Sequence, residues 1–339
     1  MNIRYNNEKV SVCMKGLVAM SDKKRISDIA ASAEVSPATV SRVFNRHPYV
    51  KEEIRSRVLE VARRMKYSPK FSATRNNIGI VVNGTDGINL GQFEVLMITA
   101  LSQLLFKRNY AFEIIPHTSA PLLHNTSLKG LITISVAAAN ALKGLDIPML
   151  TVNHEIEDVP SVSTDHRQGL KISVDHFFAK GHRQIAYIGE SPGTLAWGMV
   201  ERMAGYQDGL SANGLDFDPK FIKKDEETLL EASARIIKTG CTAVIVGCEG
   251  IVPQFCYMMY LMNKSIPADI STISFETANL SQYMVPPQTT IDQNFPVLAE
   301  TVVSRLDELI AGKPLEPLHL RLGNRLIERE SILDLTKRS

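Results

Sequence analysis

The chain has 339 residues and a mass of 37.6 kDa, enough for two or three domains. Its 44% hydrophobic and 22% charged residues exclude a largely disordered or fibrous protein. The formal net charge of +2 conceals an uneven distribution. Residues 1–75 hold 16 basic and 7 acidic side chains, whereas the remainder holds 22 basic and 29 acidic ones. A head of charge +9 on a body of charge −7 indicates a polyanion-binding module attached to a second, acidic part.

The chain lacks the sequence patterns of a membrane or exported protein. No apolar run approaches the roughly 18 residues that a membrane span needs. The first 20 residues have neither a continuous apolar core nor the cleavage site of a signal peptide, so we expect a cytoplasmic protein. The four cysteines (Cys13, Cys241, Cys248 and Cys256) have no CxxC spacing. We therefore expect reduced thiols, no metal and no cofactor.

Residues 25–45 have the pattern of two short helices joined by a tight turn. Ser27 or Asp28 can begin the first helix. Ser36 and Pro37 suit the N-cap and the first position of the second helix. The helical spacing of the apolar residues predicts a shared core, which is typical of a helix-turn-helix unit. The shared core residues would be Ala30, Val35 and Val40. The apolar face of the first helix would comprise Ile26, Ile29, Ala30 and Ala33, and that of the second Val40, Val43 and Phe44.

A third amphipathic helix, from Glu52 to Met65, would complete a trihelical unit, for which a plain helical bundle is the alternative interpretation. The outward face of the second helix favours DNA binding. Short hydroxyl side chains and helix N-terminal amides suit phosphates, and an arginine suits guanine O6 and N7 in the major groove. The face consists of Ser36, Ala38, Thr39, Ser41, Arg42 and Asn45.

The runs ISDIAASAEVSPATVSRVFN and VKEEIRSRVLEVARRMKYSP resemble the DNA-binding head of the lactose/galactose repressor family of bacterial transcription regulators. The resemblance implies that Pro37, Ala38 and Arg42 read bases in the major groove. The positions that usually touch phosphates or nearby base edges in this family correspond to Ser27, Ser36, Thr39, Ser41, Asn45 and Tyr49.

The segment after the head departs from this family. Family members continue with a hinge helix, in which the leucine of an Ala-x-x-Leu pattern enters the minor groove. Here only ten residues separate Tyr67 from Ile78, and none of them is a leucine. We expect residues 69–77 to be a plain linker. The alternative is that Phe71 or Arg75 reaches the minor groove in place of the missing leucine.

From Ile78 onward, short β-branched runs alternate with longer amphipathic stretches, a pattern that predicts two doubly wound α/β lobes. We expect helices over Phe93–Arg108, Gly169–Lys180, Arg202–Asn213 and Pro296–Ala311, the last of which would cross back to the first lobe. The predicted strands are Ile78–Val82, Ala111–Ile115, Leu131–Ser135, Met149–Val152, Ile185–Gly189, Ala243–Val246, Thr272–Phe275 and Thr289–Ile291.

The body resembles the periplasmic sugar-binding proteins, whose architecture the same regulator family uses as its effector-binding core. The segments DHFFAKGHRQIAYIGE, RMAGYQDGLSANGL and PPQTTIDQNF carry this resemblance. Ligands of such lobes bind in the cleft at the carboxyl ends of the strands. The expected division is a disordered extension (1–22), a helix-turn-helix domain (23–68), a short linker (69–77) and an effector-binding core (78–336). Its N-lobe would comprise about 78–165 and 295–322, and its C-lobe about 166–294 and 323–336.

The body has five candidate effector-binding residues, four of which are implied by the resemblance. Arg202 takes the place of an arginine that holds the effector, because a guanidinium can clamp hydroxyls or a carboxylate; a surface arginine is the alternative. Glu276 and Asn153 follow strands where many members have an aspartate. Cys248 stands where an asparagine is common. Trp197, the only tryptophan, is expected in the loop 193–198, as a stacking platform or as a packing residue.

The sequence contains no GxxxxGK[ST], HExxH, GxSxG or GxGxxG pattern, so we predict that the protein is not an enzyme. We predict a ligand-responsive, sequence-specific transcription regulator, a repressor controlled by a sugar or sugar derivative. A homodimer would place one second helix in each half-site of a near-palindromic double-stranded operator. The alternatives are a solute-binding receptor without a regulatory DNA role and an enzyme with an accessory DNA-binding head.

Overall fold

The computed structural model divides into two compact units, Met1–Ala73 and Thr74–Ser339, each with its own hydrophobic core. The predicted N-terminal extension lies outside the described residues, and so do Asn45, Phe71 and Arg75. The structure describes residues 25–44, 49–65, 76–83, 90–119, 123, 128–134, 139, 142–189, 197–276 and 280–337.

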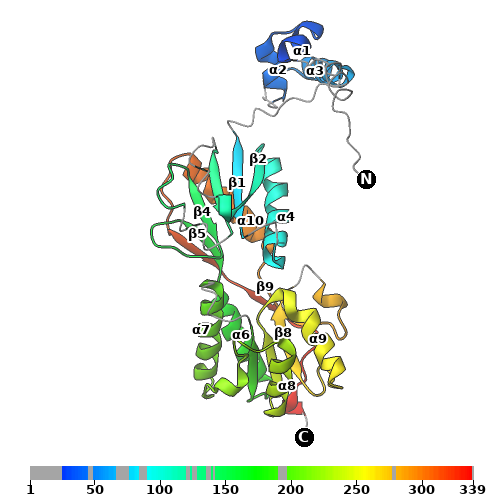
Figure 1. Cartoon of the computed structure of the whole chain (residues 1–339), viewed down its shortest axis with the longest axis vertical. Coiled ribbons are helices and arrows are strands. Elements are labelled where there is room, and N and C mark those ends of the chain that lie inside the picture. The colour runs from blue at the N-terminus through cyan, green and yellow to red at the C-terminus, as the bar shows by residue number, and fades with distance from the viewer. Residues whose placement is uncertain are drawn as a thin grey trace, which may run out of the picture. The chain divides into compact units, whose positions relative to one another are not determined.

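The first unit contains the three predicted helices, α1 (Ile26–Ser32), α2 (Pro37–Phe44) and α3 (Glu52–Arg64) (Figure 1). Glu34 turns the chain between α1 and α2 with a positive φ of 53°. Ser36 then caps α2, because its hydroxyl accepts a hydrogen bond from the Thr39 amide at 3.0 Å. The shared core consists of Ile29, Ala30, Ala33, Val40, Val43, Val58, Val61 and Ala62.

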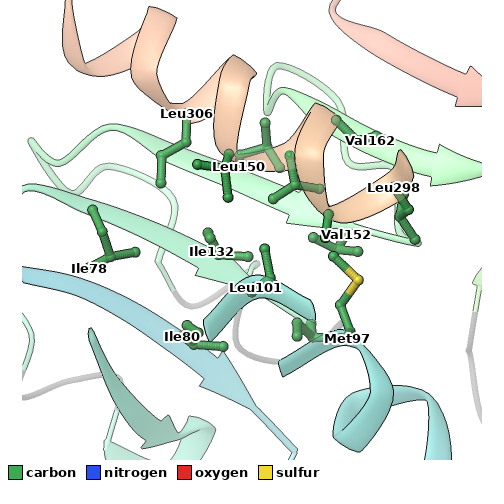
Figure 2. Close-up of a cluster of buried hydrophobic side chains, with 14 of the residues drawn as sticks. Ile78, Ile80, Met97, Leu101, Ile132, Leu150, Val152, Val162, Leu298 and Leu306 are labelled. Carbon is green, nitrogen blue, oxygen red and sulfur yellow. The ribbon is translucent and has the colours of Figure 1, made fainter. Parts of the chain in front are cut away.

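The second unit contains a six-stranded parallel sheet with the strand order β10-β5-β4-β3-β1-β2. The strands are β1 (Asn77–Val82), β2 (Ala111–Pro116), β3 (Gly130–Thr133), β4 (Met149–Val152), β5 (Ser161–Thr164) and β10 (His319–Leu322). The helices α4 (Gln92–Lys107) and α10 (Phe295–Ile310) pack side by side against this sheet. Figure 2 shows Leu101 of α4 and Leu306 of α10 directed toward Ile132 of β3. We call this sheet and its two helices the first lobe.

A second sheet has the order β11-β9-β8-β7-β6, in which β11 is antiparallel to β9 and the other pairs are parallel. The strands are β6 (Ile185–Ile188), β7 (Ala243–Val246), β8 (Ser271–Phe275), β9 (Thr289–Asp292) and β11 (Arg325–Ile327).

Helices cover both faces of the second sheet. Along β6, Ile185 and Tyr187 belong to the core that includes residues of α6 (His166–Ala179) and α7 (Trp197–Ala212). Ala186 and Ile188 point the other way, into the core that includes residues of α8 (Leu229–Lys238) and α9 (Val252–Leu261). We call this sheet and its four helices the second lobe. Together with the three-helix head, the two α/β lobes confirm the predicted fold class.

The chain passes between the two sheets at three places. It leaves the first sheet after β5 and after β10, and it returns from β9 to α10. Residues of α10 lie in the core of the first lobe, which confirms the expected return of this helix.

The helices α6 and α7 pack closely at Gly205. A Cβ atom there would lie 2.1 Å from the carbonyl oxygen of Arg167. An alanine would gain about 1 kcal/mol of helix propensity, but it would force the two helices apart. We expect Gly205→Ala to lower the free energy of unfolding by about 1–3 kcal/mol in urea denaturation. Gly250→Ala is the control, because a Cβ there would meet nothing within 4 Å. Equal stability of both variants and the natural chain would contradict this close packing.

Candidate functional site

The predicted DNA-reading residues of α2 that the structure describes lie on the outside of the head. Pro37, Ala38 and Arg42 are exposed, whereas Val40 and Val43, on the opposite side of the helix, are fully buried. Small residues at the start of an exposed helix allow its N-terminal end to approach the base edges closely.

The predicted phosphate-contacting residues surround this face. Ser27 and Ser36 are exposed, Tyr49 is 90% exposed, and Thr39 and Ser41 are half-buried. The hydroxyls of Ser36 and Thr39 lie 2.8 Å apart and share a hydrogen bond. The predicted contact by Asn45 lies outside the described residues.

A cavity of about 390 Å³ lies between the two lobes. Its walls in the first lobe come from the ends of β1, β3 and β4 and from the first turn of α4. Its walls in the second lobe come from the first residues of α6 and α7 and from the segment after β7. Of the predicted effector-binding residues, the structure brings together Asn153, Trp197, Arg202 and Cys248 in these walls.

Arg202 of α7 is the buried cation of the cavity, with 4% of its surface exposed. Its Nη1 donates a hydrogen bond to the Gly247 carbonyl, and its Nε donates to His166 Nδ1 at 3.4 Å. The guanidinium lies 3.9 Å from the centre of the Phe275 ring, where the face of the ring stabilises the charge. These contacts fix the guanidinium plane, so Arg202 is held in position before any ligand arrives.

His166 is a cavity residue that the sequence did not single out. It is the first residue of α6, follows the N-cap Asp165 and is 3% exposed. Because Nδ1 accepts from Arg202, the proton of the neutral ring resides on Nε2. Burial lowers the pKa of His166 well below its ordinary value, and the nearby charges of Arg202 and Arg321 lower it further. The ring is therefore an uncharged donor at the edge of the Trp197 indole, 5.7 Å between centroids.

Asn153 lines the cavity and also holds two crossing segments together. Its backbone is left-handed, with φ 48°, and its Oδ1 accepts a hydrogen bond from the Thr164 amide at 2.7 Å. The hydroxyl of Thr164 donates to Gln293 Oε1 at 3.0 Å. The Nδ2 of Asn153 also donates to Gln293 Oε1 at 3.5 Å, so its side chain links the end of β5 to the segment that leaves β9.

Glu276 is not among the residues that line the cavity. Its Oε2 accepts hydrogen bonds from the Thr290 hydroxyl at 2.8 Å and from Arg329 at 2.9 Å. Burial alone would raise the pKa of Glu276, but hydrogen bonds from Ser281, Thr290 and Arg329 lower it below its ordinary value. The carboxylate therefore has internal partners, and its predicted role toward a ligand stays a prediction.

The position of Trp197 differs from the expected loop. It is the first residue of α7, so its indole is anchored by a helix of 16 residues. Cys248 is buried, with 6% of its surface exposed, in the segment after β7. Within the described residues, no group of three or more His, Cys, Asp and Glu side chains is placed to hold a metal ion. None of the described helices is long and apolar enough to cross a membrane.

Two models of protein families match the chain. The model of bacterial regulatory proteins of the lacI family matches residues 25–70, and the model of the periplasmic binding protein-like domain matches residues 174–332. The chain thus combines a DNA-binding head of the lacI family with a periplasmic binding protein-like domain. The family resemblance found in the sequence is thereby confirmed.

Similar regulators extend over nearly the whole chain. The probable HTH-type transcriptional repressor ExuR of Bacillus subtilis (strain 168) is 24% identical over 344 residues, covering 92% of this chain and 99% of the relative. The HTH-type transcriptional repressor PurR of Escherichia coli O1:K1 / APEC is 26% identical over 348 residues, covering 91% and 97%.

Solved structures of regulators share the fold. The lac repressor dimer bound to operator and the anti-inducer ONPF has a TM-score of 0.72 and 22% identity, covering 92% of this chain and 100% of the other. The complex of the transcriptional regulator CelR with cellobiose has a TM-score of 0.68 and 21% identity, covering 91% and 99%.

The buried neutral state of His166 predicts an acid-sensitive fold. The unfolded chain binds a proton on this histidine near pH 6.5, whereas the folded chain does not. The free energy of unfolding should therefore fall as the pH decreases below about 6.5, with at most about 1.4 kcal/mol per pH unit from this one residue. Urea denaturation between about pH 7 and pH 5 measures this slope, and the slope should be smaller in His166→Gln. An identical slope in both proteins would contradict the assignment.

Proposed function

We propose that the protein is a sequence-specific DNA-binding transcription repressor that acts as a homodimer and responds to a sugar or sugar derivative. The observation that carries this proposal is the exposed face of α2, which presents small residues and Arg42 on a head that matches the lacI family. Regulators of this kind are not enzymes, and they act on DNA in the cytoplasm. We also propose the head (23–68), the linker (69–77) and the core (78–336) as its functional parts.

In this proposal α2 enters the major groove of a near-palindromic operator half-site. Pro37 and Ala38 lie at its N-terminal end and leave room for the base edges, while Arg42 donates to guanine O6 and N7. The hydroxyl and amide groups around this face contact phosphates. They belong to Ser27, Ser36, Thr39, Ser41, Asn45 and Tyr49.

The cavity between the lobes supports a carbohydrate effector. Its volume of about 390 Å³ suits a small molecule, and an indole, Trp197, lies beside the donors of Arg202 and His166. Among the structures that share the fold, CelR is a complex with cellobiose, and a LacI family regulator from Enterococcus faecium has bound ribose. We propose Asn153, Trp197, Arg202, Cys248 and, through a rearranged carboxylate, Glu276 as effector-binding residues.

An exposed aromatic surface supports the homodimer. On α9, the rings of Tyr257 and Tyr260 stack at 6.4 Å, and both residues are more than half exposed. Tyr283, in the short 3-10 helix Ser281–Tyr283 of the same lobe, is 76% exposed, and Val285 is 93% exposed. Exposed apolar groups in such number mark a protein interface more often than a free surface.

Replacement of Arg42 tests the proposed base readout. Arg42→Ala should weaken operator binding by about 1–3 kcal/mol and leave non-specific DNA binding nearly unchanged. Fluorescence anisotropy with operator and random duplexes, at two salt concentrations, measures both affinities. Arg64→Ala is the matched control, because it removes one exposed arginine from α3. Unchanged discrimination in Arg42→Ala would overturn the assignment of Arg42.

A thermal-shift screen over sugars, sugar acids and nucleobases tests the proposed effector. A sugar present at about 100 times its Kd should stabilise the protein by about 2.7 kcal/mol. Arg202→Ala should abolish this increment, and Arg325→Ala, which removes a 69% exposed arginine side chain, should keep it. The measured quantity is the sugar-induced increase in stability of each variant relative to the same variant without sugar. This comparison is needed because Arg202 also bonds the Gly247 carbonyl, so its loss alters the stability of the sugar-free protein. The proposal would be contradicted if no sugar stabilised the protein, or if a stabilising sugar had the same effect on Arg202→Ala.

A further inference from the structure

We propose that Arg321 is a positioning residue that couples the cavity to the arrangement of the two lobes, by clamping the first turns of α7 to the first lobe. The inference rests on the proposed function only in taking the cavity as the effector site. The residues of this interlobe clamp are Arg321, Glu155 and Glu201, with Trp197 beside them.

The guanidinium of Arg321 bonds both lobes at once. Arg321 belongs to β10 of the first sheet. Its Nε and Nη2 donate to the two carboxylate oxygens of Glu155, which follows β4, at 2.6 and 2.7 Å. Its Nη1 donates to Oε2 of Glu201, on α7 of the second lobe, at 2.8 Å. The bidentate bond to Glu155 fixes the arginine to its own lobe, so the bond to Glu201 is the part that can open.

The two carboxylates that pair with Arg321 are less exposed to solvent than those of an ordinary surface ion pair. The side chains of Glu155 and Glu201 are only 16% and 17% exposed, while that of Arg321 is 36% exposed. Sheltered charges are screened less by salt than fully exposed ones, and two carboxylates share this one cation. Separation of the lobes would leave Glu201 without this bond, so the clamp favours the lobe arrangement seen here.

The same arginine touches the wall of the cavity. Its guanidinium lies 5.1 Å from the centre of the Trp197 ring, and Trp197 lines the cavity. Trp197 and Glu201 are four residues apart and lie on one face of α7, and Arg202 follows directly. Opening of the Arg321–Glu201 bond therefore releases from the first lobe the turns that carry both the indole and the buried guanidinium of the cavity. A ligand that binds against Trp197 would therefore affect the Arg321–Glu201 ion pair, which also depends on how the two lobes are arranged.

The clamp can be measured without any effector or DNA, because Trp197 is the only tryptophan of the chain. The experiment is acrylamide quenching of its fluorescence in the ligand-free, full-length protein, over increasing KCl. In the natural chain, salt should weaken the ion pair and raise the quenching constant. Glu201→Gln and Arg321→Gln should show raised quenching at low salt already, with emission shifted to longer wavelength and little further response to KCl. We expect the fraction of molecules in which the Arg321–Glu201 contact is open to be roughly two- to fivefold higher in these variants than in the natural chain.

Two further variants separate positioning from general stability. Arg325→Gln removes an arginine that pairs with Asp292 at 2.8 Å within the second lobe, and it should retain the natural response to KCl. Arg321→Lys keeps the charge and should restore part of that response, which a loss of packing alone would not allow. Equal quenching in the natural chain and in Glu201→Gln at every KCl concentration would overturn the clamp. A protein that fails to bind DNA or sugars would leave this result untouched, so the two proposals fail independently.

Discussion

Three short crossings between the sheets determine where the ligand cavity lies and what lines it. Only one or two residues separate β5 from α6, β9 from α10 and β10 from β11. Parallel strands on either side of such short connections must present their carboxyl ends to the same space. Hydrogen bonds join the crossings to one another: Asn324 bonds Gln168 and Asp165 at 2.7 and 2.6 Å, and Thr164 bonds Gln293 at 3.0 Å. The three crossings therefore form one hydrogen-bonded group between the lobes.

The cavity buries one full charge, that of Arg202, beside polar and aromatic groups that stabilise it. A carbonyl and an aromatic face stabilise the charge of Arg202, and the same charge helps to hold His166 neutral. The nearby cation Arg321 is instead balanced by two carboxylates, those of Glu155 and Glu201. A ligand thus meets donors that are already oriented, and little side-chain ordering remains to oppose its binding.

The features that the sequence could predict are those with local signals. Capping by Ser36 and helical spacing place α2 within a residue of its observed bounds, and the β-branched runs place β4 and β7 correctly. The strands β5, β10 and β11 were missed. Two of them, β10 and β11, are short edge strands, and β5 has the sequence Ser-Val-Ser-Thr, with only one apolar residue. Such segments become strands only through their neighbours in the sheet.

The site residues that were missed depend on partners far away in the sequence. Arg321 lies 166 residues from Glu155 and 120 from Glu201, and Arg329 lies 53 from Glu276. No local pattern could show that the Glu276 carboxylate is already bonded. His166 carried only the local signal of a helix start after an N-cap aspartate, because the strand that places it at a carboxyl end, β5, could not be predicted.

The central claim is that α2 reads DNA in a symmetric dimer. Its most direct test is to select, with the full-length protein, the duplexes that it binds from a pool of random-sequence DNA. We expect an enriched inverted repeat, whose half-sites each contain a guanine at the position facing Arg42. A pool that stays random after repeated selection at moderate salt, or one enriched in a single asymmetric site, would contradict it.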